Sequence, residues 1–514
     1  MLSKNNPQID FFTQTIYDKL VPKDHLLVKI DSLVDFSFVY ESVADRYSKD
    51  MGRSSRDPVM MMKIMLLEYL YTLSDVEVSK RAATDIVFRW FLGLSIDDSA
   101  PDDTTISHFR IKRLGKEKFE EFFNEIVRLC IKQNLVNSNR FLIDSTDVSV
   151  NASLPFGKKL IRDAYRKVIR QVETFNEDLA KEFLESFEQE IAKEYENPGK
   201  VEAAKHFGIA LSNLNKLYVK THEEIDANPE YQKAFQVCYD IADHYLHQKK
   251  DKIVSAVDTD ARAAYKSPRN PKVGYKDHII VDEDSEIILA SIQTPFNVGD
   301  EKKLVELLNK VEENFELKPK EVTADKAYGT MDNRAHLKDN EIVSNIAFYD
   351  EADWGTVFGI RDFKISEDTL SVTCPNNITT TKFVEREDKK RKSRYRHFVF
   401  SKNDCDQCPL REQCLKPDKK SGKIRLKHRR LMVFLRYDAI LNDLKRVETE
   451  EFKAAYAKRF KVERRFATMV ANHGLRRSRY IGMERSSIHI IMANMASNIV
   501  RMVNLLYQPP AVLT

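Results

Sequence analysis

Tyr456-Ala-Lys-Arg-Phe-Lys-Val-Glu463, near the carboxyl end of the chain, is the stretch on which the interpretation of the fold depends. It lies between Val447 and Asn472, in a segment without Gly or Pro that predicts one long helix. On such a helix Arg459 and Glu463 fall on an otherwise apolar face, because steps of three and four residues return to one side. A buried salt bridge would explain the two charges. Carboxylates elsewhere in the chain would instead make Glu463 part of a site.

The composition indicates a large globular protein with more than one core. The chain has 514 residues, of which 42% are hydrophobic, and this length predicts two to four domains that need no disulfides. The net charge of +4 says little, but residues 381–430 carry 18 Lys or Arg against 7 Asp or Glu. Such a local excess is typical of a surface that attracts DNA phosphates, and equally of a solvated loop.

The sequence predicts neither a secreted nor a membrane protein. Its first residues, Met1-Leu-Ser-Lys-Asn-Asn-Pro7, lack an apolar segment. The apolar runs 60–73 and 488–506 contain charged or amide side chains, and therefore predict buried helices rather than membrane spans. Six cysteines, four of them between Cys374 and Cys414, favour a reducing compartment. We therefore expect a cytoplasmic protein without a membrane partner.

Residues 1–138 predict a helical N-terminal unit. Asp102 is suited to begin a helix that carries a run of basic side chains, among them Arg110 and Arg113. A basic helix of this kind can enter the major groove of DNA, and it is also common in plain helical bundles. The DNA-binding interpretation makes Arg110 and Arg113 contacts to DNA.

A strand pattern follows this unit and carries the first acid of interest. Phe141–Val150 is rich in β-branched residues, which predicts a strand, and it contains Asp144 and Asp147. An acid in a core strand is costly unless hydrogen bonds or a cation satisfy it. The strand therefore predicts a satisfied structural acid or a cation site.

The segment after residue 252 predicts the rest of an α/β sheet. Its pattern is a hairpin, an amphipathic helix and a short strand, at residues 274–292, 300–314 and 321–325. The last strand ends at Asp325, and ligands of such sheets often lie at the carboxyl ends of strands. We expect a mixed sheet flanked by helices, with Asp325 at its functional edge.

Two segments interrupt the α/β pattern. Residues 157–252 are strongly charged and have helical apolar spacing, which predicts a helical insertion without chemistry of its own. Residues 349–440 predict a basic β insertion that contains cysteines. These are Cys374, Cys405, Cys408 and Cys414. Four thiolates can bind structural Zn²⁺, although the irregular spacing fits free thiols as well.

The order of the acids along the chain resembles that of a known family. Asp144, Asp325 and Glu463, with Tyr456 and Arg459 in Tyr-x2-Arg-x3-Glu spacing, resemble bacterial insertion-sequence DDE transposases of the IS-four and IS-five superfamily. Further matching motifs are Asp144-Ser-Thr146, Thr323-Ala-Asp-Lys-Ala-Tyr-Gly329, Asp258-Thr-Asp-Ala-Arg262 and Gly274-Tyr275. The resemblance spans nearly the whole chain and implies an RNase H-like core.

The resemblance also implies roles for these residues. The three acids would be catalytic and would bind Mg²⁺ or Mn²⁺ for displacement at phosphorus. Tyr456 and Arg459 would hold DNA phosphates or a displaced base near the cut. The family usually has a lysine seven positions after the glutamate, where this chain has Val470. Loss of that contact would weaken activity, unless an arginine such as Arg464 binds DNA in its place.

The function that the resemblance implies is a transposase that binds the terminal inverted repeats of an insertion sequence, cleaves DNA and joins its 3′ ends to a target. Its partner is double-stranded DNA, and the synapsis of two ends implies a homodimer, in a bacterial cytoplasm. The alternatives are a catalytically impaired or domesticated DNA-binding protein and a nuclease without strand transfer. The expected domains are 1–138 for DNA binding, 139–156 and 253–348 for the core, 157–252 and 349–440 for the insertions, and 441–514 for the catalytic and closing helices.

Overall fold

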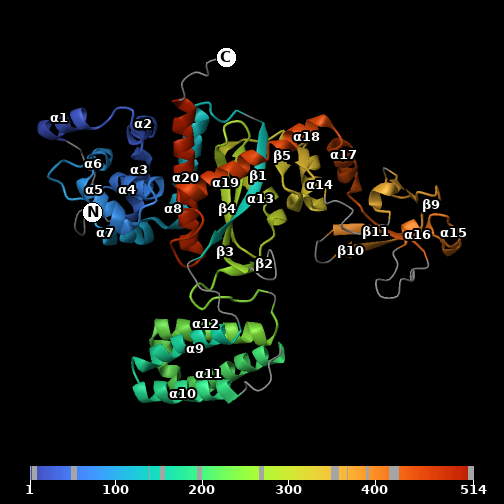
Figure 1. Cartoon of the computed structure of the whole chain (residues 1–514), viewed down its shortest axis with the longest axis horizontal. Helices are drawn as coiled ribbons and strands as arrows, with labels where there is room; N and C mark the ends of the chain where they lie inside the picture. The colour runs from blue at the N-terminus through green and yellow to red at the C-terminus, as the bar shows by residue number, and fades with distance from the viewer. Residues whose placement is uncertain are drawn as a thin grey trace.

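The protein consists of a central sheet with helices on its faces and two bodies that extend from it (Figure 1). In the view of Figure 1 the N-terminal helices lie to the left of the sheet, a helical bundle lies below it, and a small β-rich region lies to the right. The computed structural model describes residues 2, 9–47, 55–137, 139–150, 157–193, 200–249, 251–265, 271–348, 358–366, 368–388, 393–415 and 428–507.

The central sheet is mixed, as the sequence predicts. Its order is β2-β3-β1-β5-β6, with β4 paired to β3. β1 is antiparallel to β3 and parallel to β5, and β5 is parallel to β6. The strands are Arg140–Ser149 (β1), Arg262–Tyr265 (β2), Pro271–Asp282 (β3), Ile288–Pro295 (β4), Glu321–Ala324 (β5) and Val343–Ile346 (β6). The strand and hairpin predicted from the sequence are thus confirmed as β1, β3 and β4.

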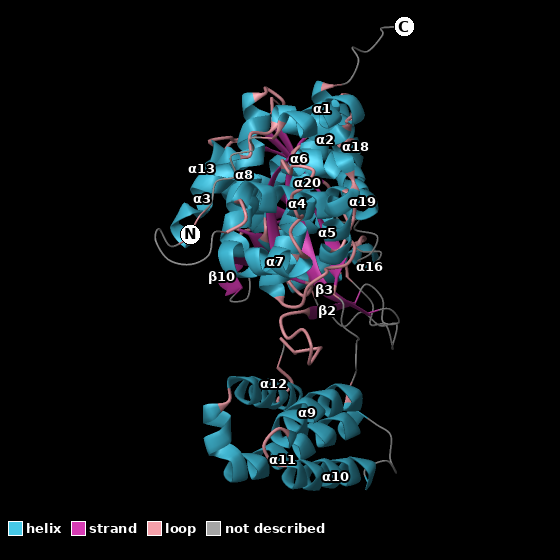
Figure 2. Cartoon of the chain, turned by 90° about the vertical axis from the view of Figure 1, so that its left-hand side faces the viewer, coloured by secondary structure: helices cyan, strands magenta, loops and turns pink. Residues whose placement is uncertain are grey.

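The helices of the sheet are α13 (Leu304–Phe315), α14 (Met331–Asp339), α19 (Phe460–Asn472) and α20 (Met483–Leu506). Helix α20 is buried along nearly its whole length and packs against both β4 and the N-terminal helices (Figures 1 and 2). The Asn498 amide pairs with the backbone of β4, because it donates to the Ile288 carbonyl at 2.8 Å and accepts from the Ile288 amide at 2.9 Å. Among the described residues, no helix is long and apolar enough to cross a membrane.

The N-terminal helices share one apolar core with the sheet. They are α1 (Phe11–Leu20), α2 (Leu26–Leu33), α3 (Ser37–Val43), α4 (Pro58–Leu70), α5 (Asp75–Thr84), α6 (Ile86–Leu92), α7 (Asp103–His108) and α8 (Gly115–Lys132), with a π-helical segment, Phe109–Leu114, between the last two. Leu66 of α4, Phe122 of α8, Ile143 of β1 and Ile491 of α20 belong to the same buried cluster. The N-terminal helices and the sheet therefore depend on each other for burial.

A buried ionic network joins these N-terminal helices. The Arg110 guanidinium contacts both carboxylate oxygens of Glu68 at 2.9 Å and also binds Asp75 at 2.9 Å. Arg479, which precedes α20, donates to the Leu73 carbonyl at 2.5 Å, and the Glu68 carboxylate lies 4.0 Å from it. The structure thus places Arg110, predicted from the sequence as a DNA contact, inside the protein, where its side chain is only 4% exposed.

Replacement of Arg110 by Ala should lower the free energy of unfolding by about 3–5 kcal/mol, because it leaves the Glu68 carboxylate buried without its partner. Urea denaturation measures this loss. Lys112→Ala is the matched control on the same segment, and its exposed side chain predicts a change within about 0.5 kcal/mol. Equal stability of the two variants would contradict the structural role of Arg110.

The helical bundle has an apolar core of its own. It contains α9 (Lys158–Glu173), α10 (Glu177–Lys193), α11 (Lys200–Ala227) and α12 (Pro229–Leu246), within the residues expected to form a helical insertion. Its buried cluster includes Tyr165, Phe187 and Ile241 and is distinct from the cluster of the sheet. The bundle stands away from the sheet (Figure 2), and Val150 and Val254, at the two ends of this segment, pack in one small cluster.

A fragment of residues 157–256 should fold alone, because its apolar core is complete within it. We expect a helical circular dichroism spectrum and a cooperative thermal transition. A fragment of residues 1–137 is the contrast: it should aggregate or lack a cooperative transition, because its core continues into β1 and α20. A non-cooperative 157–256 fragment would show that the bundle depends on the sheet.

The β-rich region holds two three-stranded sheets between α14 and the final helices. One contains β7 (Lys364–Ile365), β8 (Val372–Thr373) and β9 (Thr379–Thr380), and the other β10 (Phe383–Asp388), β11 (Ser393–Val399) and β12 (Arg430–Phe434). Two short helices, α15 (Lys402–Asp406) and α16 (Arg411–Cys414), follow β11. Much of the basic run in 381–430, at 389–392 and 416–427, lies outside the described residues.

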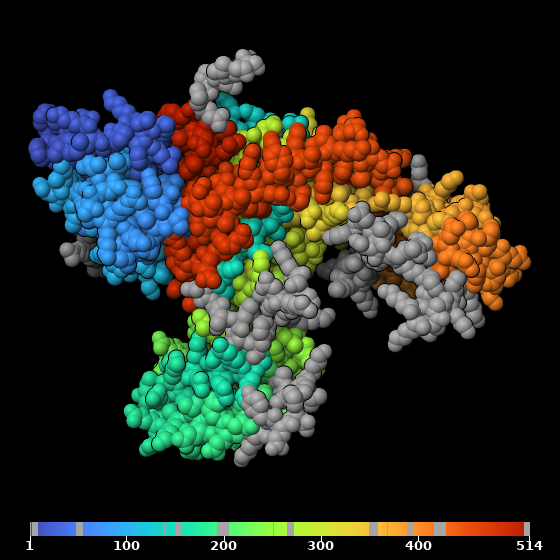
Figure 3. Space-filling model, in the orientation of Figure 1, coloured from blue at the N-terminus to red at the C-terminus, as the bar shows by residue number. Residues whose placement is uncertain are grey.

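The prediction of one long helix over 447–472 is wrong. The chain forms α17 (Tyr437–Val447), α18 (Glu450–Ala457) and α19, which lie across the front of the molecule in Figure 3. Thr449 caps α18 as expected. The amides of Lys458 and Arg459 then donate to carbonyls three residues back, as in a 3₁₀ turn, and this tighter turn separates α18 from α19. Tertiary contacts favour this break, because the Lys458 ammonium binds the buried Glu283 carboxylate at 2.7 Å.

Candidate functional site

The site lies where the break between α18 and α19 meets the middle of β1 and the carboxyl end of β5. β1 and β5 are parallel, and Ile143 pairs with Ala324 in their register. The residue after each member of this pair is an acid, so Asp144, within β1, and Asp325, directly after β5, lie next to each other. Asp325 leaves the sheet to begin a short 3₁₀ turn, Lys326–Tyr328, and its carboxylate accepts a hydrogen bond from the Lys326 amide at 2.8 Å.

The guanidinium of Arg459 brings three acids together. Its Nη1 lies 3.3 Å from Asp144 Oδ2 and 3.8 Å from Asp325 Oδ1. Its Nη2 lies 2.8 Å from Glu463 Oε1, one turn further along α19. The three acids predicted from the sequence therefore surround one positive group, although they come from separate segments of the chain.

Burial differs among these acids. The side chain of Asp144 is 17% exposed, against 44% for Asp325 and 54% for Glu463. Burial raises the pKa of Asp144 to about 6; the Ser145 amide and Arg459 oppose the shift, and the other two acids add to it. The folded protein thus disfavours the ionised form of Asp144, as expected for a carboxylate in a site that binds a cation.

Asp144→Asn should stabilise the protein at neutral pH in the absence of divalent metal. A folded-state pKa of about 6, against an ordinary 3.8, means that ionised Asp144 opposes folding by about 2–3 kcal/mol above pH 6. This penalty disappears below pH 4, where the carboxyl is protonated in both states. Chemical denaturation at pH 7.5 and pH 4 measures the difference, and Asp325→Asn, at the more exposed acid, should change stability little. A loss of stability in Asp144→Asn at pH 7.5 would refute this account.

The other predicted residues of the signature occupy different surroundings. Tyr456 stacks on Phe452, with ring centroids 5.5 Å apart, and its ring also faces the Arg459 guanidinium at 5.8 Å. Burial raises the pKa of the Tyr456 phenol. Arg464, in contrast, binds the buried Glu286 carboxylate, and Val470 packs against the main apolar core. Neither Arg464 nor Val470 is among the groups that the structure brings to the three acids.

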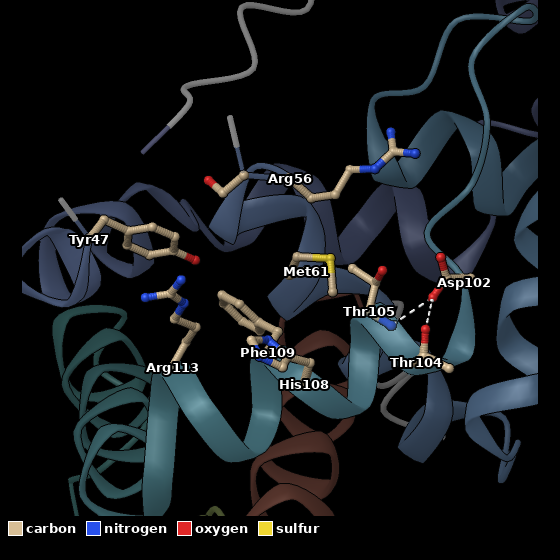
Figure 4. A pocket seen from close by; sticks show the side chains of 10 residues that line it. Tyr47, Arg56, Met61, Asp102, Thr104, Thr105, His108, Phe109 and Arg113 are labelled. Atoms are coloured by element: carbon tan, nitrogen blue, oxygen red, sulfur yellow. Dashed lines mark hydrogen bonds between the residues drawn. The ribbon is translucent and has the colours of Figure 1, made fainter. Parts of the chain in front are cut away.

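Arg113 borders a cavity of about 870 Å³ in the N-terminal helices (Figure 4). Its guanidinium stacks over the Tyr47 ring at 4.7 Å and donates to the Arg46 carbonyl at 2.8 Å. Arg56, Thr104 and Asp102 also line the cavity, whose wall therefore carries cationic and hydroxyl groups and one carboxylate. The structure thus separates the two predicted DNA contacts of this region, because Arg113 reaches the cavity and Arg110 does not.

The four cysteines predicted to bind Zn²⁺ lie in the β-rich region. Cys374, Cys405 and Cys414 pack against its apolar core, and burial raises the pKa of the Cys405 and Cys414 thiols. The Cys405 sulfur accepts a hydrogen bond from the Arg429 amide at 3.4 Å. Across the part of the chain that the structure describes, no group of three or more His, Cys, Asp or Glu side chains is arranged to hold a metal ion.

Two buried residues of the core, Tyr328 and Asp277, receive no individual role in the sequence interpretation. Tyr328 belongs to the short turn that follows Asp325, and burial raises its pKa well above the ordinary value, with Asp300 and Asp144 adding to the shift. Asp277 of β3 accepts hydrogen bonds from Ser291 at 2.6 Å and from Asn494 of α20 at 3.0 Å. The sequence could have indicated a structural role for Asp277, because this acid interrupts the apolar pattern of β3.

The three acids supply the type of donor atom that a hard divalent cation binds, but among the described residues they are not arranged around a common metal position. All three offer carboxylate oxygens, which Mg²⁺ and Mn²⁺ prefer to imidazole or thiolate groups. The Arg459 guanidinium acts as a stand-in cation, because each carboxylate lies within 3.8 Å of it. The site thus defines a class of protein with a carboxylate cluster beside two parallel strands, β1 and β5, of an α/β sheet.

Comparison with protein families gives two matches within this chain. Residues 15–112 match a Transposase domain (DUF772), and residues 373–503 match a Transposase DDE domain. The second match contains Tyr456, Arg459 and Glu463, whereas Asp144 and Asp325 precede it. Comparison with curated proteins gives no match. The two family matches support a DDE transposase, an enzyme class whose partner is DNA.

Proposed function

We propose that this protein binds the terminal inverted repeats of an insertion sequence, cleaves the DNA and transfers its 3′ ends to a target. The observation that carries the proposal is the convergence of Asp144, Asp325 and Glu463 on one cationic group. The matches to two transposase domains, one on each side of the first two acids, support the same function. The mixed sheet with helices on its faces supports an RNase H-like core.

The three acids are proposed to hold Mg²⁺ or Mn²⁺. When bound, these ions activate water or a DNA 3′-hydroxyl and stabilise the leaving oxygen. Asp144 would be held by its strand and by the Ser145 amide, which donates to its carboxylate at 2.8 Å. Arg459, which contacts all three acids in the structure, carries a planar fork that suits a DNA phosphate. Tyr456 is held beside it by Phe452 and offers an aromatic face to a base.

The N-terminal cavity supports a role of the first 138 residues in DNA binding. Its wall combines the cationic side chains of Arg56 and Arg113 with the Thr104 hydroxyl and the Tyr47 ring. Cations and hydroxyls are common contacts to DNA phosphates. Two DNA ends must meet during transposition, and a homodimer is the proposed assembly.

The decisive experiment is cleavage of DNA that carries the ends of the element. Wild-type protein with Mg²⁺ should release 3′ ends and join them to a target. Asp144→Asn, Asp325→Asn and Glu463→Gln should each lower the cleavage rate by at least about a hundredfold, because each removes a metal-binding carboxylate. Asp147→Asn, three residues after Asp144, is the control and should remain active.

Other outcomes separate the alternatives. Specific DNA binding without cleavage by the wild type would favour a domesticated DNA-binding protein. Cut but unjoined products would favour a nuclease. Full activity in all three acid variants would exclude the proposed site.

A further inference from the structure

A second polar cavity lies where α19, α20 and the turn between β3 and β4 meet. Its volume is about 300 Å³. Arg464 and Arg465 line it from α19, Arg501 lines it from α20, and Glu286 lines it from the turn. Glu463 pairs with Arg459, whereas the next residue, Arg464, pairs with Glu286, so α19 serves two different polar sites.

Positive charge exceeds negative charge in this cavity. The Glu286 carboxylate is nearly buried and serves two guanidiniums, since it pairs with Arg464 and lies 3.6 Å from Arg501. Arg465 donates to the carbonyl and hydroxyl of Ser497 instead. Within the described part of the chain Arg465 has no carboxylate within 4.0 Å. Three guanidiniums therefore face one carboxylate.

Buried polar atoms in the wall of the cavity remain unsatisfied. The Arg465 side chain is 5% exposed, and its Nε has no hydrogen-bond partner among the described residues. The same holds for Nε2 of His473, which is 2% exposed and whose Nδ1 contacts the Tyr69 carbonyl at 3.0 Å. Both side chains line the cavity. Buried atoms of this kind are rare in folded proteins, and a bound ion or ligand is one of the conditions that explain them.

We propose that this cavity binds a phosphate group through Arg464, Arg465 and Arg501. Planar guanidiniums match the oxygens of a phosphate, and several of them around one cavity suit a dianion or a phosphodiester. Glu286 is the resident counter-ion, which holds two of the arginines in place and competes with the incoming anion. The phosphate comes from free phosphate or from a DNA backbone, and the second source rests on the proposed function.

Calorimetric titration of the full chain with inorganic phosphate, at constant ionic strength in chloride, tests the site. Wild type should bind saturably. Arg501→Gln and Arg464→Gln should each weaken binding about tenfold, since each removes a charge-assisted hydrogen bond. Glu286→Gln should strengthen binding about tenfold, because it removes the competing carboxylate. Arg166→Gln, at an exposed arginine of the helical bundle, should bind as the wild type does.

Circular dichroism confirms that each variant is folded; Arg464 provides the safest variant because its side chain is 54% exposed. No saturable binding of phosphate by wild type, or equal affinity in all variants, would overturn the proposal.

Anisotropy of a labelled duplex distinguishes the two sources. Weaker duplex binding by Arg464→Gln and Arg501→Gln, with competition by phosphate, identifies the DNA backbone. Unchanged duplex binding alongside altered phosphate affinity identifies free phosphate. Cleavage by wild type is scored separately, so failure of this site and failure of the transposase proposal give different results.

Discussion

The interaction on which the site depends is the contact of one guanidinium with three carboxylates. Asp144, Asp325 and Glu463 repel one another when ionised, and Asp144 also pays for its burial. Arg459 offsets this repulsion, so the sheet and the helix can bring the acids together. The sharp junction between α18 and α19 places Arg459 beside Asp144 of β1 and Asp325 at the end of β5.

The rest of the fold holds this arrangement in place. The parallel pairing of β1 and β5 sets the first two acids side by side, and α19 brings the third. Helix α19 ends against the N-terminal helices, where the Thr72 hydroxyl donates to the Asn472 carbonyl at 3.0 Å and His473 contacts the Tyr69 carbonyl. A movement of the N-terminal helices would therefore shift α19, the helix that carries Glu463.

Sequence patterns predicted those parts of the fold that are set locally. The β-branched run of β1 and the hairpin of β3 and β4 are recognisable from their own residues. The division of 447–472 into two helices is not, because no Gly or Pro marks it and the Lys458 contact with Glu283 is distant in sequence. The burial of Arg110 could not be predicted for the same reason. Its neighbours along the segment are basic, but Glu68, the acid that pairs with it inside the protein, lies 42 residues away. The convergence of the acids was predicted only through a family resemblance, since spacing alone cannot show which strands pair.

The helical bundle leaves and rejoins the sheet at two points that pack together, Val150 and Val254. A segment attached in this way places little demand on the length or sequence of what lies between its ends. Evolution can therefore enlarge, shorten or exchange it without disturbing the strand that carries Asp144. Related chains are accordingly expected to differ more in this bundle than in the sheet. A larger or smaller bundle would change how far the protein extends from the sheet and would leave the acid cluster unchanged.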